Sequence, residues 1–151
     1  GNNVCNSWML STALTGMEVV VASPARYRPK EAFIEQAQAA GGRVRVVTDP
    51  VEAVRDADVL YTDIWVSMGD EQERADRIQA LKGYTIDSHL LACAPPDAFV
   101  MHCLPAHRGE EITDEVIEGP QSIVWDQAEN RLHAQKALLV HLVTGKSPVT
   151  E

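Results

Sequence analysis

Short apolar runs that alternate with helical patterns constrain the fold of this chain more than any other feature. The runs are rich in valine and other strand formers, and helix-forming segments lie between them. The expected strands cover residues 17–22, 43–47, 58–62, 99–102 and 122–125. Because strands that alternate with helices build parallel sheets through right-handed crossovers, we predict an α/β fold. It is a Rossmann-like, doubly wound parallel sheet with helices on both faces.

Capping residues and glycines delimit the helices between these strands. Asn2 and Asn3 can cap the first helix, and Asp49 with Pro50 marks another helix start. The expected helices cover residues 4–14, 30–40, a short segment from 50, 70–81, 87–93, 113–118 and 127–143. The last helix has a broad apolar stripe, for which we expect packing on the sheet of its own domain. The alternative is that it partly covers a missing partner domain.

The composition limits the class of protein. With 151 residues, of which 45% are hydrophobic, the chain suits a single globular domain with a sizeable core. The formal net charge of −9 argues against nucleic acid or an anionic membrane as a partner. We recognise neither a membrane-spanning run nor a signal peptide, and the 3 cysteines suit reduced thiols. We therefore expect a cytoplasmic protein.

The segment that follows the expected strand at 99–102 carries the densest chemistry. Residues 101–111 combine a thiol, imidazoles, a guanidinium and carboxylates. Ligands of open α/β sheets bind at the carboxyl ends of strands, so these groups are expected at a ligand site. Cys103 is the candidate reactive group because flanking imidazoles can tune the pKa of a thiol. The alternative is a small buried core residue, which is how free cysteine usually behaves.

The neighbours of Cys103 limit what the thiol can do. His102 is expected to point to the opposite face of the strand, which weakens a Cys–His nucleophile pair. A zinc site from Cys103, His102 and His107 matches no familiar spacing, so we expect no metal. Leu104 precedes Pro105, which favours an extended backbone that can aim the Leu104 carbonyl into the site and permits a cis bond.

A second polar strand end follows residues 58–62. Asp63 can hold an ammonium group or orient a proton transfer, unless it is a solvated loop carboxylate. Ser67 and Met68 lie in a small loop that can close over a ligand or can simply connect two elements. Asn3 can bind a carboxylate or amine, or only cap its helix, and Arg131 can bind an oxyanion or stay solvated. Together these groups suit a small zwitterionic substrate better than a dinucleotide.

Four motifs resemble the ornithine carbamoyltransferase family, in family order and over nearly the whole chain. They are GNN at residues 1–3, DIWVSMG at 63–69, HCLPAHRGEE at 102–111 and ENR at 129–131. The resemblance implies transfer of a carbamoyl group from carbamoyl phosphate to the δ-amine of L-ornithine, giving citrulline and phosphate without a cofactor. It also implies a partner domain that binds carbamoyl phosphate and assembly as a homotrimer.

The resemblance assigns a role to each candidate residue. It implies that ornithine is bound by Asn3, Asp63, Ser67 and Met68, that Cys103 and Asp63 are catalytic, and that carbamoyl phosphate is bound by Cys103, Leu104 and Arg131. Residues 1–126 would form the ornithine-binding domain, and 127–151 a helix and tail that partly pack on the missing domain.

The chain also departs from the family pattern. The Ser-x-Arg-Thr and His-Pro-x-Gln motifs of the carbamoyl-phosphate domain do not occur in the sequence. We therefore expect a fragment that is inactive alone. Other possibilities are a carbamoyltransferase for another amine such as putrescine or aspartate, an amino-acid-binding module without chemistry, or a nucleotide-binding domain.

Overall fold

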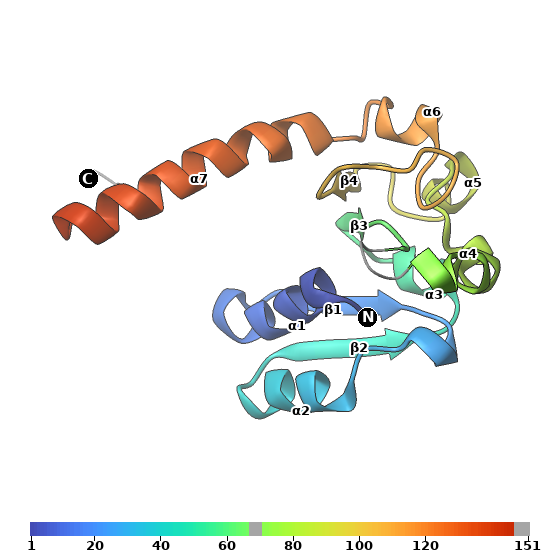
Figure 1. Ribbon diagram of the computed structural model, residues 1–151, viewed down its shortest axis with the longest axis horizontal. Helices are drawn as coiled ribbons and strands as arrows, with labels where there is room; N and C mark the ends of the chain where they lie inside the picture. Colours follow the sequence, from blue (N-terminus) through green and yellow to red (C-terminus); the bar gives the residue numbers. More distant parts are fainter. Residues whose placement is uncertain (67–70, 147–151) are drawn as a thin grey trace.

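The computed structural model describes residues 1–66 and 71–146 and alternates strands with helices (Figure 1). The strands are β1 (Glu18–Ala22), β2 (Arg43–Val47), β3 (Val59–Thr62) and β4 (Phe99–His102). The helices are α1 (Asn3–Thr15), α2 (Glu31–Ala39), α3 (Pro50–Val54), α4 (Arg74–Leu81), α5 (Ser88–Leu91), α6 (Asp114–Ile117) and α7 (Val124–Thr144). The predicted α/β class is confirmed, and the strands pair in parallel.

The strand pairing determines which polar groups meet. β1 pairs with β2, and β3 pairs with β4 in a register that joins Thr62 to His102. Parallel strands end at the same edge, so the residues that follow β3 and β4 are neighbours. This register brings Asp63 next to Cys103, which lies 40 positions later in the sequence.

Two groups of buried residues stabilise this arrangement. One lies where α1 and α2 pack on β1 and β2, around Met9, Ile34 and Ala37. The other surrounds β3 and β4 and includes Leu60 and Val100. Helices α3, α5, α6 and the start of α7 contribute to the second group. Burying such side chains stabilises the fold by roughly 1.5–3 kcal/mol each relative to exposure.

The expected strand at 122–125 is wrong. Ser122 forms only an isolated bridge with Val100, held by bonds from Val100 N to the Gln121 carbonyl and from Ile123 N to the Val100 carbonyl. Helix α7 already begins at Val124, whose side chain is fully buried. The apolar run Ile123–Trp125 therefore follows an isolated bridge at Ser122 and forms the start of a helix, with Val124 buried.

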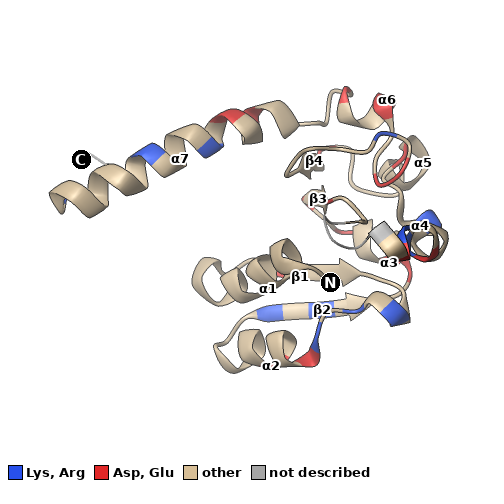
Figure 2. Cartoon of the chain, viewed as in Figure 1, with Lys and Arg blue, Asp and Glu red and all other residues tan. Residues whose placement is uncertain are grey.

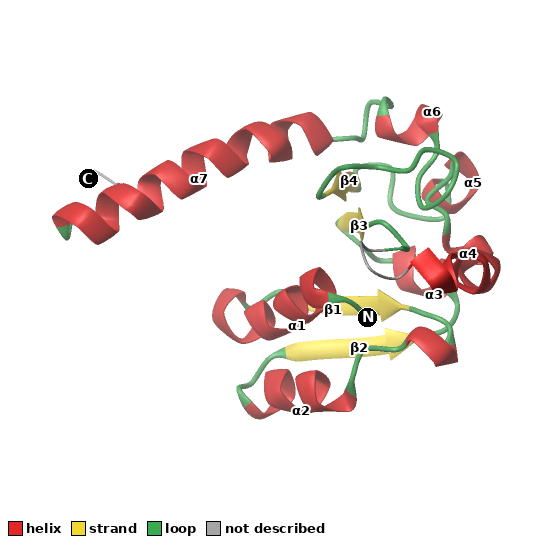
Figure 3. Cartoon of the chain, viewed as in Figure 1, coloured by secondary structure: helices red, strands yellow, loops and turns green. Residues whose placement is uncertain are grey.

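Helix α7 projects from the rest of the chain as one continuous helix (Figures 1 and 3). The predicted packing of its stripe on the domain's own sheet is wrong for most of its length, because its large apolar residues after Val124 are exposed. They are Trp125, Leu132, Leu138, Leu139, Val140, Leu142 and Val143. The last turns of the helix also lack Asp, Glu, Lys and Arg (Figure 2).

Among the described residues, no helix is long and apolar enough to cross a membrane.

Candidate active site

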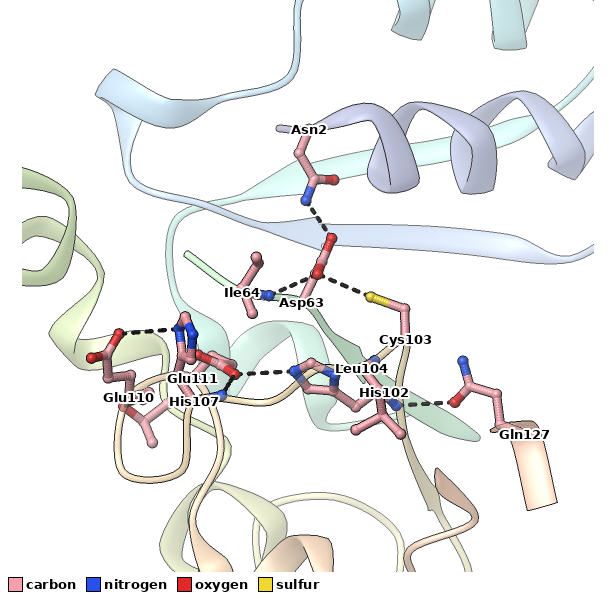
Figure 4. A network of polar contacts seen from close by, with 11 residues as sticks. Asn2, Asp63, Ile64, His102, Cys103, Leu104, His107, Glu110, Glu111 and Gln127 are labelled. Carbon is pink, nitrogen blue, oxygen red and sulfur yellow. Dashed lines mark hydrogen bonds and ion pairs between the residues drawn. The ribbon is translucent and has the colours of Figure 1, made fainter. Parts of the chain in front are cut away.

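Asp63 is the centre of the polar contacts at the strand ends (Figure 4). The Cys103 thiol donates to Asp63 Oδ1 over 2.9 Å, and the backbone N–H of Ile64 donates to the same oxygen over 2.7 Å. The amide of Asn2 donates to Oδ2 over 2.7 Å. The carboxylate thus joins the ends of β3 and β4 to the start of α1, which is not how a solvated loop carboxylate behaves.

Asn2, rather than Asn3, makes the contacts at this turn. Its side-chain oxygen accepts a hydrogen bond from Cys5 N over 2.8 Å and so caps α1, while its amide nitrogen binds Asp63. Asn3 is the first helical residue and is exposed. Sequence reasoning missed the link from Asn2 to Asp63. The only signal was the Asn-Asn pair, which does not reveal which asparagine faces the sheet.

The thiol of Cys103 lies in an environment that keeps it protonated. Burial raises the pKa of Cys103 to about 11, and its hydrogen bond to the negatively charged Asp63 acts in the same direction. Tyr61, on β3, lies beside the thiol, and burial raises the pKa of its hydroxyl to about 12. At neutral pH the site therefore presents an S–H group whose proton is directed at a carboxylate.

His102 points away from this contact and organises the turn behind Cys103 (Figure 4). Its side chain and that of Glu111 are both fully buried, and His102 Nε2 lies 3.1 Å from Glu111 Oε1. The N–H of Leu104 donates to His102 Nδ1 over 2.8 Å, so the neutral ring carries its proton on Nε2 and donates it to Glu111. The predicted opposite orientation of His102 is confirmed.

This buried pair supports an unusual backbone. Leu104 adopts φ of 56°, which is uncommon for a residue other than glycine, and the Leu104–Pro105 bond is cis. The Leu104 N–H is fixed by His102, and the His102 N–H is fixed by Gln127 Oε1 at 3.0 Å. The extended backbone expected at Leu104 is therefore wrong, because Leu104 adopts a left-handed conformation in which its N–H binds the side chain of His102.

A pocket of about 580 Å³ lies beside the same turn. Its lining includes Cys103 and Leu104 from the turn, and Trp125 and Arg131 from α7. Arg108 also contributes, but its guanidinium pairs with Asp114 and Glu118. The structure thus brings the three residues assigned to carbamoyl phosphate onto one pocket. Ser67 and Met68 lie outside the described residues.

The zinc ligands considered from the sequence do not gather. Cys103 binds Asp63 and His102 binds Glu111, and these side chains point to different partners (Figure 4). Within the described part of the chain, the one group of side chains able to hold a metal ion is His107, Glu110 and Glu111. That group lies on the Glu111 side of the network, apart from the thiol.

Comparison with known proteins supplies the family. Residues 1–142 match the family model described as aspartate/ornithine carbamoyltransferase, Asp/Orn binding domain. The chain is 83% identical over 145 residues to an ornithine carbamoyltransferase of Methanoculleus marisnigri, covering 96% of this chain and 47% of the relative. It is 55% identical over 149 residues to the one of Archaeoglobus fulgidus, covering 99% and 48%.

Solved structures agree with these relatives. The ornithine carbamoyltransferase from Pyrococcus furiosus superposes with a TM-score of 0.85 at 51% identity, over 93% of this chain and 46% of that one. The anabolic enzyme from Campylobacter jejuni superposes with a TM-score of 0.88 at 37% identity, over 96% and 49%. The chain spans about half the length of the curated relatives that it matches. It belongs to the aspartate/ornithine carbamoyltransferase family, whose Asp/Orn-binding domain it matches over nearly its whole length.

Proposed function

We propose that this chain forms the ornithine-binding part of an ornithine carbamoyltransferase, which makes citrulline and phosphate from L-ornithine and carbamoyl phosphate. The observation that carries the proposal is the hydrogen bond between Cys103 and Asp63 at the rim of the pocket that includes Arg131. The Asp63 carboxylate suits the amine of ornithine, and the Arg131 guanidinium suits the phosphate of carbamoyl phosphate. The Cys103 thiol contacts this carboxylate and lines the same pocket as the guanidinium. The relatives named ornithine carbamoyltransferase support the same choice.

Asp63 would receive the amino-acid substrate. Its two oxygens are occupied by neutral donors, so the negative charge itself stays uncompensated by any of the three contacts. The ammonium group at the amino-acid end of ornithine, placed against this carboxylate, would gain a charge-assisted hydrogen bond. Asn3, which is exposed at the same turn, together with Ser67 and Met68, would complete the site for ornithine.

Cys103 would pass the proton that the amine has to lose. An ammonium group has no lone pair, so the δ-nitrogen becomes a nucleophile only after deprotonation. With a pKa near 11 the thiol is protonated, so it accepts a proton at sulfur only as its own proton moves to Asp63. The amine then attacks the carbamoyl carbon, the bond from that carbon to the phosphate oxygen breaks, and the phosphate leaves with the second proton that the attacking nitrogen has to lose.

The turn and α7 would position carbamoyl phosphate. The carbonyl of Leu104 can accept from the carbamoyl amide, and Arg131 can pair with phosphate oxygens, since both residues line the pocket. A phosphate dianion that leaves needs more positive charge than this. We therefore propose that the whole enzyme supplies further donors from a carbamoyl-phosphate domain. We also propose that it assembles as a homotrimer and acts in the cytoplasm.

A chimeric enzyme tests the function. This chain replaces the 145 matching residues of the Methanoculleus marisnigri relative, to which it is 83% identical. We expect the chimera to form citrulline at a rate comparable with that of the intact relative, and to prefer ornithine over aspartate and putrescine. The 151-residue chain alone should form none.

The outcomes separate the competing functions. A folded chimera that carbamoylates aspartate or putrescine faster than ornithine would show that one of these amines is the substrate. A chimera that binds ornithine without forming citrulline, beside an active relative, would leave only an amino-acid-binding module. Citrulline formation by the chain alone at the chimera's rate would show that it already holds a complete site.

A further inference from the structure

Three buried polar atoms converge behind the His102 turn without hydrogen-bond partners. They are His107 Nδ1, Glu110 Oε2 and Glu111 Oε2. One ligand atom from each of these residues lies within 4.8 Å of those of the other two. His107 Nδ1 and Glu110 Oε2 lie 3.7 Å apart as an ion pair, whereas Glu111 Oε2 has no partner of either kind among the described residues. A buried carboxylate oxygen without a partner is costly, because it has lost water and gained no replacement. Glu111 Oε2 therefore calls for a further partner in the folded protein.

The second oxygens of Glu111 and Glu110 are held by other groups, which leaves the remaining oxygen of each carboxylate free for a ligand. The other oxygen of Glu111 accepts from His102 Nε2 at 3.1 Å and from the N–H of His107 at 2.5 Å, and Glu111 is fully buried. The other oxygen of Glu110 pairs with Arg74. Figure 4 shows the three side chains gathered at the Glu111 end of the network. These contacts form a built site rather than a loose cluster of surface acids.

The chemistry and spacing of the atoms fit a metal ion. An imidazole nitrogen and two carboxylate oxygens are ligands of first-row divalent metals, which bind them at about 2.0–2.2 Å. Ligands on opposite sides of such an ion lie up to about 4.4 Å apart by the same bond lengths. The His107 Nδ1–Glu110 Oε2 distance of 3.7 Å already falls within that span. A shift of about half an ångström in the partly exposed His107 and Glu110 side chains would bring the third ligand within it.

We propose that His107, Glu110 and Glu111 bind one divalent first-row metal ion. The ion would be completed by water on the exposed side, since the side chains of His107 and Glu110 are 42% and 23% exposed. Its site adjoins the chain of contacts from Glu111 through His102 to the Leu104 N–H. An occupied site therefore stabilises the turn that carries Leu104 and Cys103. The proposal does not depend on the proposed function.

Cobalt(II) provides the test because its visible absorption reports the ligands that bind it. Titration of the metal-free chain should show one tightly bound Co²⁺ per chain without a thiolate charge-transfer band. His107→Gln and Glu110→Gln should each weaken binding at least about ten-fold, since even partners of metal ligands matter that much. Neither change removes the contacts of Glu111 with His102, and circular dichroism should confirm that both variants fold.

Matched controls isolate the site. His133 and Glu129 form an exposed pair 3.5 Å apart on α7, so His133→Gln should leave the affinity unchanged. Arg74→Gln removes the ion pair of Glu110 but keeps its carboxylate, so binding should stay the same or tighten. Cys103→Ser should have no effect on the cobalt spectrum.

Three results would overturn the proposal. The first is the absence of saturable Co²⁺ binding, which would leave water or a proton at the three atoms. The second is equal affinity in His107→Gln and the unchanged chain, and the third is a cobalt spectrum that Cys103→Ser abolishes.

Discussion

At the scale of single residues, Asp63 and Cys103 act as one unit. The thiol donates to a carboxylate that is also held by Asn2 and by the backbone of Ile64. Each contact fixes the orientation of the carboxylate but adds no positive charge. The unit is therefore ready to accept a cation, and its negative charge suppresses ionisation of the thiol.

The reactivity of Cys103 tests this coupling. Thiolate is the form that iodoacetamide alkylates, and the pKa of Cys103 is raised to about 11, so alkylation should be slow at pH 8 and rise steeply above pH 10. Asp63→Asn removes the negative charge that opposes ionisation. The thiol pKa should fall, and alkylation at pH 8 should speed up by about ten-fold for each pKa unit.

Mass spectrometry of the modified peptide measures the rate, with Cys93 of the same chain as the internal reference. A pH profile of Cys103 that Asp63→Asn leaves unchanged would contradict the coupling.

The residues that could be predicted were those in motifs, most of which directly follow a strand end. Asp63, Cys103, Leu104 and Arg131 were assigned from motifs, and the structure brings the last three to one pocket and the first two into contact. The buried contact of Glu111 with His102 could not be predicted, because the two residues lie nine positions apart and only the folded structure buries them together. No local pattern encodes such a contact.

At the scale of elements, the start of α1 joins helix stability to the site. Asn2 caps the helix with its oxygen and binds Asp63 with its nitrogen. We expect Asn2→Ala to lower the free energy of unfolding by about 1 kcal/mol or more, because it removes a cap and leaves Asp63 with one donor fewer. Asn3→Ala should change it by less than about 0.5 kcal/mol, since Asn3 is exposed.

Urea denaturation of the two variants beside the unchanged chain gives both values. Equal losses at the two asparagines would mean that the cap is shared.

Element types were predictable where pattern and local capping agreed. Strands β1 to β4 coincide with valine-rich or apolar runs. Helix α3 begins with Asp49 as its cap and Pro50 at its first position, as expected. Prediction failed at residues 122–125, where three consecutive apolar residues were compatible with either a strand or a helix start. The competition was decided by the burial of Val124 against the core around Val100, which is a tertiary contact.

At the scale of the whole molecule, the exposed stripe on α7 sets the behaviour of the chain in solution. Leu139 and Leu142 are 62% and 70% exposed on an uncharged stretch of the helix. Contiguous apolar surface of this kind promotes association. We expect the chain to self-associate, and Leu139→Gln with Leu142→Gln to shift it toward the monomer.

Analytical ultracentrifugation over a range of concentrations reports the change. Leu14→Gln is the matched control, because Leu14 is 90% exposed on α1, away from the stripe. If Leu14→Gln reduced association as much as the changes in α7, the stripe would not be the contact.

Steady-state kinetics of Asp63→Asn in the chimeric enzyme shows whether Asp63 binds the ammonium group at the amino-acid end of ornithine. Asparagine keeps the shape of the side chain but loses the charge. Losing one charge-assisted contact is worth roughly 1.5–3 kcal/mol, so kcat/KM for ornithine should fall by about one to two orders of magnitude. The KM for carbamoyl phosphate should stay the same. Equal losses for both substrates would contradict the account and make Asp63 a purely structural residue.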